Sequence, residues 1–271
     1  MTFSIRFAAA LLSVAALALP GALSAQAPSF LFTVSPGSEA GAPTSFLHAD
    51  VGYGQRIFKA IGAERIEQRA GMQLALGDRF MLLGQAGFAG QTDSLSSHID
   101  ARTELLANVF NRSARRVFAF GLGVARERSS QTVALGRVVA GYRAPKWEAM
   151  SNLRLERAVG GPSAELRDGI DVITTAGAAH DVGASMRLGV EAVGEDLEGF
   201  WDKNEAEGGA KLMVGPTLRI APDATRWNFL VGTGAVMQLT NSTRSPELDG
   251  PARDLQTRSG YIVRASVAYR W

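Results

Sequence analysis

Residues 264–271 read RASVAYRW, and in this stretch apolar or small side chains alternate with polar ones. The alternation begins a few residues earlier, and one face collects Tyr261, Val263, Ala265, Val267, Tyr269 and Trp271. Successive side chains of a β-strand point to opposite sides of the sheet. A period of two therefore predicts a strand over 260–271, with one apolar face, one polar face and an aromatic residue at its end.

The same period recurs along the chain in segments of about ten residues, the length of a tilted membrane strand. The segments predicted as strands are 47–53, 66–76, 80–90, 99–109, 117–126, 131–142, 147–155, 170–179, 184–192, 210–220, 227–239 and 260–271. Short polar turns alternate with longer polar loops between them, which is the layout of an up-and-down barrel. An even number of strands places both chain ends on the short-turn side.

The composition narrows the function classes. Hydrophobic residues make up 46% of the chain and charged residues 20%, with a net charge of +2 and no cluster of Lys or Arg. Nucleic-acid binding is therefore not expected. The chain has no Cys and three His, so it has no disulfide framework and no thiolate chemistry. We expect neither a metal site nor a cofactor.

Residues 1–27 have the layout of a secretory signal peptide. Arg6 precedes an apolar core from Phe7 to Leu19, and a Pro-Gly break and small residues follow. The apolar core is too short to span a bilayer, which takes roughly 20 residues. We therefore expect a cleaved signal at 1–27, a periplasmic N-terminal segment at 28–43 and a barrel at 44–271.

Aromatic residues mark both ends of the expected strands. Trp147, Trp227 and Tyr269 lie beside short turns or near the C-terminus, while Tyr53 and Tyr261 lie at the opposite ends of their strands. Two aromatic belts are expected of a membrane barrel. The alternative is a soluble periplasmic β-sandwich or a lipocalin-like barrel. About twelve strands of similar length, each with charges on one face, favour the membrane barrel, because its lumen can hold those charges.

The terminal strand with its final Trp271 resembles the C-terminal signature of Gram-negative outer-membrane β-barrel proteins. The resemblance also covers the signal peptide and the rhythm of strands and loops. It implies an all-β fold, an antiparallel transmembrane barrel of about twelve strands in an up-and-down meander. It further implies a place in the outer membrane, contact with lipid and lipopolysaccharide, and recognition of the last strand by the barrel-assembly machinery.

The polar face of the strands predicts the residues that line the lumen. These pore-lining candidates are His48, Asp50, Glu67, Arg69, Asp100, Arg102, Glu104, Arg154, Glu156, Arg187, Glu191 and Lys211, with Arg137, Glu148, Arg219 and Arg264 on the same face. Both charge signs are present, which leaves two interpretations open. The charges line a polar pore of mixed selectivity, or they form a cross-strand network of ion pairs that fills the barrel and fixes its register.

The function expected from this pattern is a narrow porin-like channel for small solutes or a structural and surface component. The alternative is an outer-membrane lipid hydrolase that uses Ser96, His98 and Asp100, which are spaced two apart near a long-loop rim. Cα atoms two apart on a strand are roughly 6.5–7 Å from each other. A contact between Ser and His is then easier to form than a chain of all three groups.

Two further expectations concern the seam and one irregular strand. His48, Asp50 and Ser266 face inward on the first and last strands, and we expect hydrogen bonds there rather than catalysis. Pro216 falls inside the strand 210–220, where a closed barrel has no edge to accommodate a missing N–H. We therefore expect a β-bulge at Pro216, assisted by Gly215.

Overall fold

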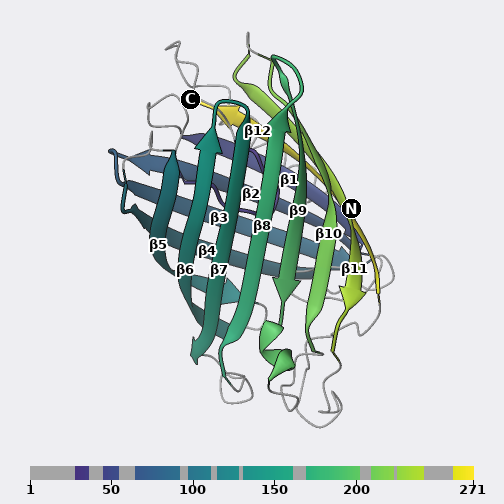
Figure 1. Cartoon of the computed structure of the whole chain (residues 1–271). Helices are drawn as coiled ribbons and strands as arrows, with labels where there is room; N and C mark the ends of the chain where they lie inside the picture. Colours follow the sequence, from purple (N-terminus) through teal and green to yellow (C-terminus); the bar gives the residue numbers. More distant parts are fainter. Residues whose placement is uncertain are drawn as a thin grey trace.

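A computed structural model of the chain describes residues 28–36, 45–54, 65–91, 97–110, 115–127, 131–160, 169–201, 209–222, 225–240 and 259–271. It is a closed antiparallel barrel, which confirms the predicted fold (Figure 1). The strands are β1 Phe46–Gly54, β2 Arg65–Leu76, β3 Phe80–Gln91, β4 Ser97–Asn108, β5 Arg116–Glu127, β6 Gln131–Ala144, β7 Trp147–Gly160, β8 Asp171–Asp181, β9 Met186–Glu195, β10 Lys211–Ile220, β11 Trp227–Gln238 and β12 Gly260–Arg270.

Each strand pairs with its sequence neighbours, and β12 pairs with β1 to close the barrel. The Trp271 N–H donates to the carbonyl of Ser45 at 3.3 Å, so the start and the end of the barrel meet on the short-turn side. The single-turn 3-10 helix η3, Leu197–Phe200, follows β9 at the opposite end (Figure 1). Among the described residues, no helix is long and apolar enough to cross a membrane.

The barrel has an apolar outside and a charged inside. Along β7 and β11, exposed and buried residues alternate strictly over most of the strand. Exposed apolar side chains on the outer faces include Leu105, Leu122, Val124, Leu153, Leu155, Leu188, Val190, Phe229, Val231 and Val263. Soluble monomers rarely expose continuous apolar surface of this extent, because its contact with water is unfavourable.

Aromatic side chains lie at both ends of the outer surface. The rings of Trp227 and Tyr269 are 4.9 Å apart at the short-turn end, and those of Tyr53 and Tyr261 are 6.2 Å apart at the long-loop end. All four belong to the outward face of their strands. Their positions agree with the two belts expected from the sequence.

The expected bulge at Pro216 is wrong. The pairing of β10 with β11 omits Gly215 and Pro216, but the register is the same on both sides of that gap. On the other side, Pro216 pairs with Val190 of β9 without interruption. The backbones of β10 and β11 are close here, since a Cβ on Gly215 would lie 1.7 Å from the Thr233 carbonyl oxygen. The glycine therefore keeps the two strands in contact beside the proline, without an extra residue.

Candidate functional site: the charged lumen and the loop inside it

All twelve pore-lining candidates occupy inward-facing strand positions. Eight of them are buried: Glu67, Arg69, Glu104, Arg154, Glu156, Arg187, Glu191 and Lys211. The other four, His48, Asp50, Asp100 and Arg102, are half-buried. A buried charge is costly unless it is paired or hydrogen-bonded, so their partners determine what the lumen can do.

The ion pairs beside the barrel seam reach across a glycine. Arg264 of β12 and Glu67 of β2 are both in register with Gly52 of β1, which lies between them. The Arg264 Nη2 reaches a Glu67 carboxylate oxygen at 2.6 Å, and Arg69 Nε reaches the same carboxylate at 2.5 Å. A Cβ at Gly52 would lie 3.4 Å from the Arg264 Nε. The missing side chain therefore lets two residues separated by a whole strand form a pair.

A second set of ion pairs crosses β5 in the same way. Arg137 of β6 donates to both carboxylate oxygens of Glu104 of β4, at 2.7 and 2.8 Å. Gly121 and Gly123 of β5 lie under this pair, and a Cβ on Gly123 would be 2.7 Å from the Glu104 Cγ. On β7, Arg154 Nε lies 2.7 Å from Glu156. These contacts show the ion-pair network that was one of the two interpretations of the lumen charges.

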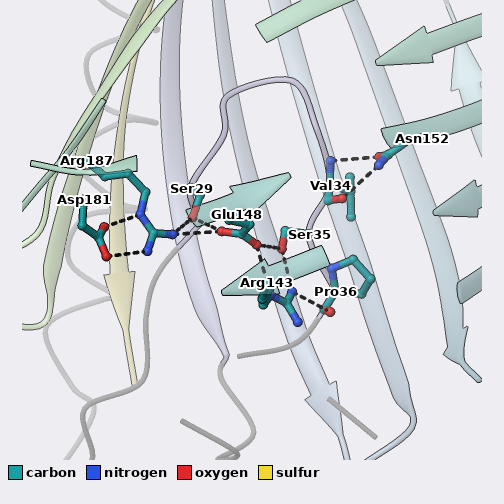
Figure 2. A network of polar contacts seen from close by, with 9 residues as sticks. All are labelled: Ser29, Val34, Ser35, Pro36, Arg143, Glu148, Asn152, Asp181 and Arg187. Atoms are coloured by element: carbon teal, nitrogen blue, oxygen red, sulfur yellow. Dashed lines mark hydrogen bonds and ion pairs between the residues drawn. The ribbon is translucent and has the colours of Figure 1, made fainter. Parts of the chain in front are cut away.

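The first nine described residues, 28–36, lie inside the barrel as a loop (Figure 2). Glu148 of β7 holds both ends of this loop. Its carboxylate accepts hydrogen bonds from the hydroxyl of Ser29 and, at 2.5 Å, from that of Ser35. Arg187 donates to Ser29 Oγ at 2.8 Å and to Glu148 at 3.0 Å. Arg143 repeats the pattern on the other side, with Ser35 Oγ at 2.8 Å and Glu148 at 3.1 Å. One buried carboxylate thus joins two loop residues and two wall arginines.

The apex of the loop is held through its backbone. The N–H groups of Leu31, Phe32 and Thr33 all donate to the Glu191 carboxylate of β9, at 2.9, 3.0 and 3.0 Å. Successive N–H groups that converge on one anion form a concave anion-binding arrangement. Here the loop supplies the N–H groups and the barrel wall supplies the anion. The loop therefore compensates a carboxylate that would otherwise be buried without enough donors.

Asparagine side chains and an arginine bind the remaining backbone of the loop. Asn152 of β7 accepts from the Val34 N–H at 2.9 Å and donates to the Val34 carbonyl at 3.0 Å (Figure 2). Asn228 of β11 donates to the Pro28 carbonyl at 3.3 Å. Arg143 donates to the Pro36 carbonyl at 3.0 Å. These contacts recognise main chain, so they fix the path of the loop.

Two phenylalanines anchor the loop in apolar parts of the lumen. Phe30 is 4% exposed and packs in a cluster with Val117, Ala119, Val139, Met150 and Ala179. A Cβ on Gly177 of β8 would lie 2.6 Å from the Phe30 ring, and one on Gly232 of β11 would lie 2.6 Å from Leu31. Phe32 packs against a second buried cluster, and Arg264 stacks over its ring at 4.9 Å. The loop fits recesses that glycines leave in the wall.

Both ends of the loop 28–36 lie at the short-turn end of the barrel. Its first contact, Asn228, is the second residue of β11, which begins at the short-turn end. The apex lies deeper, beside Glu191, and the chain returns to Arg143, the penultimate residue of β6, at the short-turn end again. We expected residues 28–43 to form a periplasmic segment. The structure places 28–36 within the lumen instead, and 37–43 lie outside the described residues.

A cavity of about 100 Å³ remains between the loop and the wall. The loop contributes Pro28 and residues 30–35 to its lining. The wall contributes Phe46, His48, Asp50, Arg69, Met72, Gln73, Leu83, Gly84, Gln85, Arg102, Arg137, Asn152, Arg154, Ile173, Thr175, Leu230, Arg264 and Ser266. Most of these residues belong to β1–β4 and to the strands that flank the loop. The space is large enough for several water molecules.

The first of the two candidate catalytic sets falls largely outside the described residues. Ser96 lies outside it, and of His98 only the backbone is described, opposite Ala89. In the seam set, Asp50 lies opposite Ser266. The His48 ring instead turns toward β2, where a Cβ on Gly71 would be 1.8 Å from its Nε2. That Nε2 has no hydrogen-bond partner among the described residues, so the hydrogen-bonded seam expected for His48 is not found.

Metal binding finds no support in the described ranges, where no three His, Asp or Glu side chains are grouped to hold an ion. Sequence reasoning missed the loop and its backbone-binding residues Asn152 and Asn228. The signal that was present is the apolar run of Phe30, Leu31, Phe32 and Val34 in a segment without a strand partner, since four such side chains need a site of burial.

Comparison with known structures supports the architecture. The NanC porin has a TM-score of 0.59 to this chain at 9% sequence identity, over 83% of this chain and 100% of that one. A structure of the KdgM porin in complex with disordered oligogalacturonate gives a TM-score of 0.49 at 12% identity, over 85% and 99%. No protein-family model and no curated protein matches the sequence. At these identities the likeness concerns the fold.

Proposed function

We propose that this chain is an outer-membrane barrel that acts as a narrow, porin-like channel for small solutes, with a non-catalytic role. The observation that carries the proposal is the cavity of about 100 Å³ that remains beside the loop, among the charged residues of the lumen. The loop and the ion pairs therefore do not fill the lumen completely. Barrels of this strand number lie between small filled barrels and the large open porins.

The outer surface supports a place in a membrane. Its apolar side chains gain from contact with lipid, while every backbone group of a closed barrel can pair with a neighbouring strand. The layout of residues 1–27 supports export to the outer membrane as a cleaved signal. The proposal includes contact with lipid and lipopolysaccharide, and recognition of β12 by the barrel-assembly machinery, because its outward face ends in Tyr269 and Trp271.

The loop makes the channel narrow. It occupies the lumen from the short-turn mouth to the level of Glu191, and it is held by side chains of β6, β7, β9 and β11. Solute is left with the cavity between the loop and the wall, which is lined largely by residues of β1–β4. We therefore propose that the loop sets the conductance, and that its removal widens the channel.

Planar-bilayer recording of the purified protein and of a variant lacking residues 28–36 tests the proposal. The full chain should show small discrete conductance steps, and the deletion variant steps severalfold larger. Polyethylene glycols of increasing size should enter only the deletion variant. Heat-modifiable gel mobility establishes that both barrels are folded. Electrical silence of both folded proteins would overturn the channel and leave a structural or surface role.

A further inference from the structure

Some of the arginines that line the cavity share a carboxylate. Five arginines line it: Arg69, Arg102, Arg137, Arg154 and Arg264. Among the described residues, Glu67 pairs with both Arg69 and Arg264, and Glu104 pairs with Arg137 and lies 3.9 Å from Arg102. Glu156 pairs with Arg154. The acidic side chain in the lining itself is Asp50, which lies opposite Arg69 in the β1–β2 register.

Arg102 is the weakest-paired member of this set. Its Nε lies 3.9 Å from Glu104, beyond hydrogen-bond distance, and Glu104 is already held by both arms of Arg137. The Arg102 side chain is 28% exposed and faces the lumen. Within the described part of the chain, Arg102 has no other ion pair. In the register its neighbours are Gln85 of β3 and Ala125 of β5, and neither carries a charge.

The rest of the lining suits a small molecule with one charged end. Phe32, Phe46, Leu83, Ile173 and Leu230 provide an apolar side, while amides such as Gln85 supply neutral hydrogen-bonding groups. Ligand sites usually combine such apolar walls with a few converging polar groups. The planar guanidinium of arginine matches a carboxylate, with which it forms two parallel hydrogen bonds. The volume limits the occupant to a few non-hydrogen atoms.

We propose that this cavity is a binding site for small organic carboxylates, with Arg102 as the residue that holds the carboxylate group. The bound carboxylate pairs with Arg102, because Glu104 is already hydrogen-bonded to Arg137. The apolar side of the cavity receives the hydrocarbon body of the solute. This inference names a class of solute for the proposed channel. Binding of the carboxylate stands on the cavity alone, whereas its passage through the barrel rests on the channel proposal.

Binding is tested with butyrate and with butyramide, its uncharged match of the same shape, by calorimetric titration of the folded protein in detergent at low salt. Two variants are compared. Arg102→Gln keeps length and hydrogen-bonding ability but removes the charge. Arg126→Gln is the matched control, because Arg126 pairs with Ala101 in the adjacent register position but belongs to the outward face of β5.

The expected result is saturable binding of butyrate and not of butyramide, weakened at least tenfold in Arg102→Gln and unchanged in Arg126→Gln. Butyrate affinity that survives Arg102→Gln, or equal binding of butyramide, would overturn the site. Reversal potentials in a potassium butyrate gradient separate this proposal from the previous one. A conducting channel without preference for butyrate contradicts the site alone, while a silent barrel that binds butyrate contradicts the channel alone.

Discussion

Two walls of the same lumen neutralise their carboxylates in different ways. On the wall that bears the loop, Glu191 is bound by N–H groups of residues 28–36, and Glu148 by two hydroxyl groups of the loop as well as by Arg143 and Arg187. On the wall that faces the cavity, Glu67 and Glu104 are bound by arginines of the barrel itself. The carboxylates of the first wall thus receive hydrogen bonds from residues 28–36. The ion pairs of the second wall are made between barrel side chains.

The difference shows how one barrel can combine a rigid frame with a restricted passage. Ion pairs such as Arg264 with Glu67 join strands that are not neighbours, and they stabilise the barrel independently of the position of the loop. The Glu191 carboxylate instead holds the loop against the wall, and within the described ranges its hydrogen-bond donors are N–H groups of the loop. Substitutions of the two kinds should therefore separate barrel stability from loop position.

The largest effect is expected for Glu148→Ala. This change removes the shared acceptor of two loop serines and a carboxylate partner of Arg143 and of Arg187, while Asp181 still binds Arg187. Breaking a buried ion pair from one side costs about 3–5 kcal/mol. We expect a loss of that order in the free energy of unfolding, measured by urea titration in detergent micelles, together with release of the loop.

Glu67→Ala is the matched control for this prediction. It also leaves two arginines with one carboxylate fewer, but on the wall without the loop. The chain has no cysteine, so the substitution Val34→Cys introduces a single thiol in the loop, and the rate at which maleimide labels this thiol reports the position of the loop. Fast labelling should appear with Glu148→Ala and not with Glu67→Ala. Equal labelling in both backgrounds would abolish the distinction between the two walls.

An intermediate effect is expected for Glu191→Gln. The amide keeps the shape but presents an NH₂ group to three N–H donors, so part of the apex loses its acceptor. Hydrogen bonds to charged groups contribute about 1.5–3 kcal/mol each, and we expect a loss near the lower end. Labelling at position 34 should rise, while the cooperativity of barrel unfolding stays the same. If Glu191→Gln is labelled as slowly as the protein that carries only Val34→Cys, the apex of the loop is held by packing alone.

The smallest effect is expected for Gly177→Ala. The new methyl group would lie about 2.6 Å from the Phe30 ring, so the loop must shift. Overpacking of this kind costs roughly 1–3 kcal/mol, and we expect the lower bound, because the loop can move. Gly136→Ala is the control, since a Cβ there meets nothing within 4 Å. Combining Gly177→Ala with Phe30→Ala in a double-mutant cycle should remove the clash, and strict additivity would refute the contact.

The sequence predicted the strands well because the alternation of each strand is a local signal. The segment 227–239 differs by one residue from β11. The segment 147–155 ends five residues before Gly160, the last residue of β7, because the consecutive charged residues Glu156 and Arg157 interrupt the apolar/polar alternation. The parity of the strands also placed Glu67 and Arg154 on the inner face. Which arginine meets which carboxylate was beyond sequence reasoning, because glycines such as Gly52 set those pairs.

The loop escaped prediction for a different physical reason. Its hydrogen bonds to Glu148, Asn152 and Glu191 span more than 100 residues, and many involve its main chain, which leaves no pattern of side chains. An alternation test cannot detect a segment that pairs with no strand. The alternation in the terminal stretch RASVAYRW, by contrast, predicted the closing strand of the barrel, and β12 does pair with β1.

The position of both loop ends has a consequence for assembly. Because the hydroxyl groups of Ser29 and Ser35 bind the same carboxylate, residues 28–36 form a hairpin whose two ends lie on the same side of the lumen. Threaded connections are rare in proteins, since one part must wait for another to form. Here the ring can close first and receive the hairpin afterwards, or close around it. Either order gives the same unknotted product, so the obstruction adds no topological barrier to biogenesis.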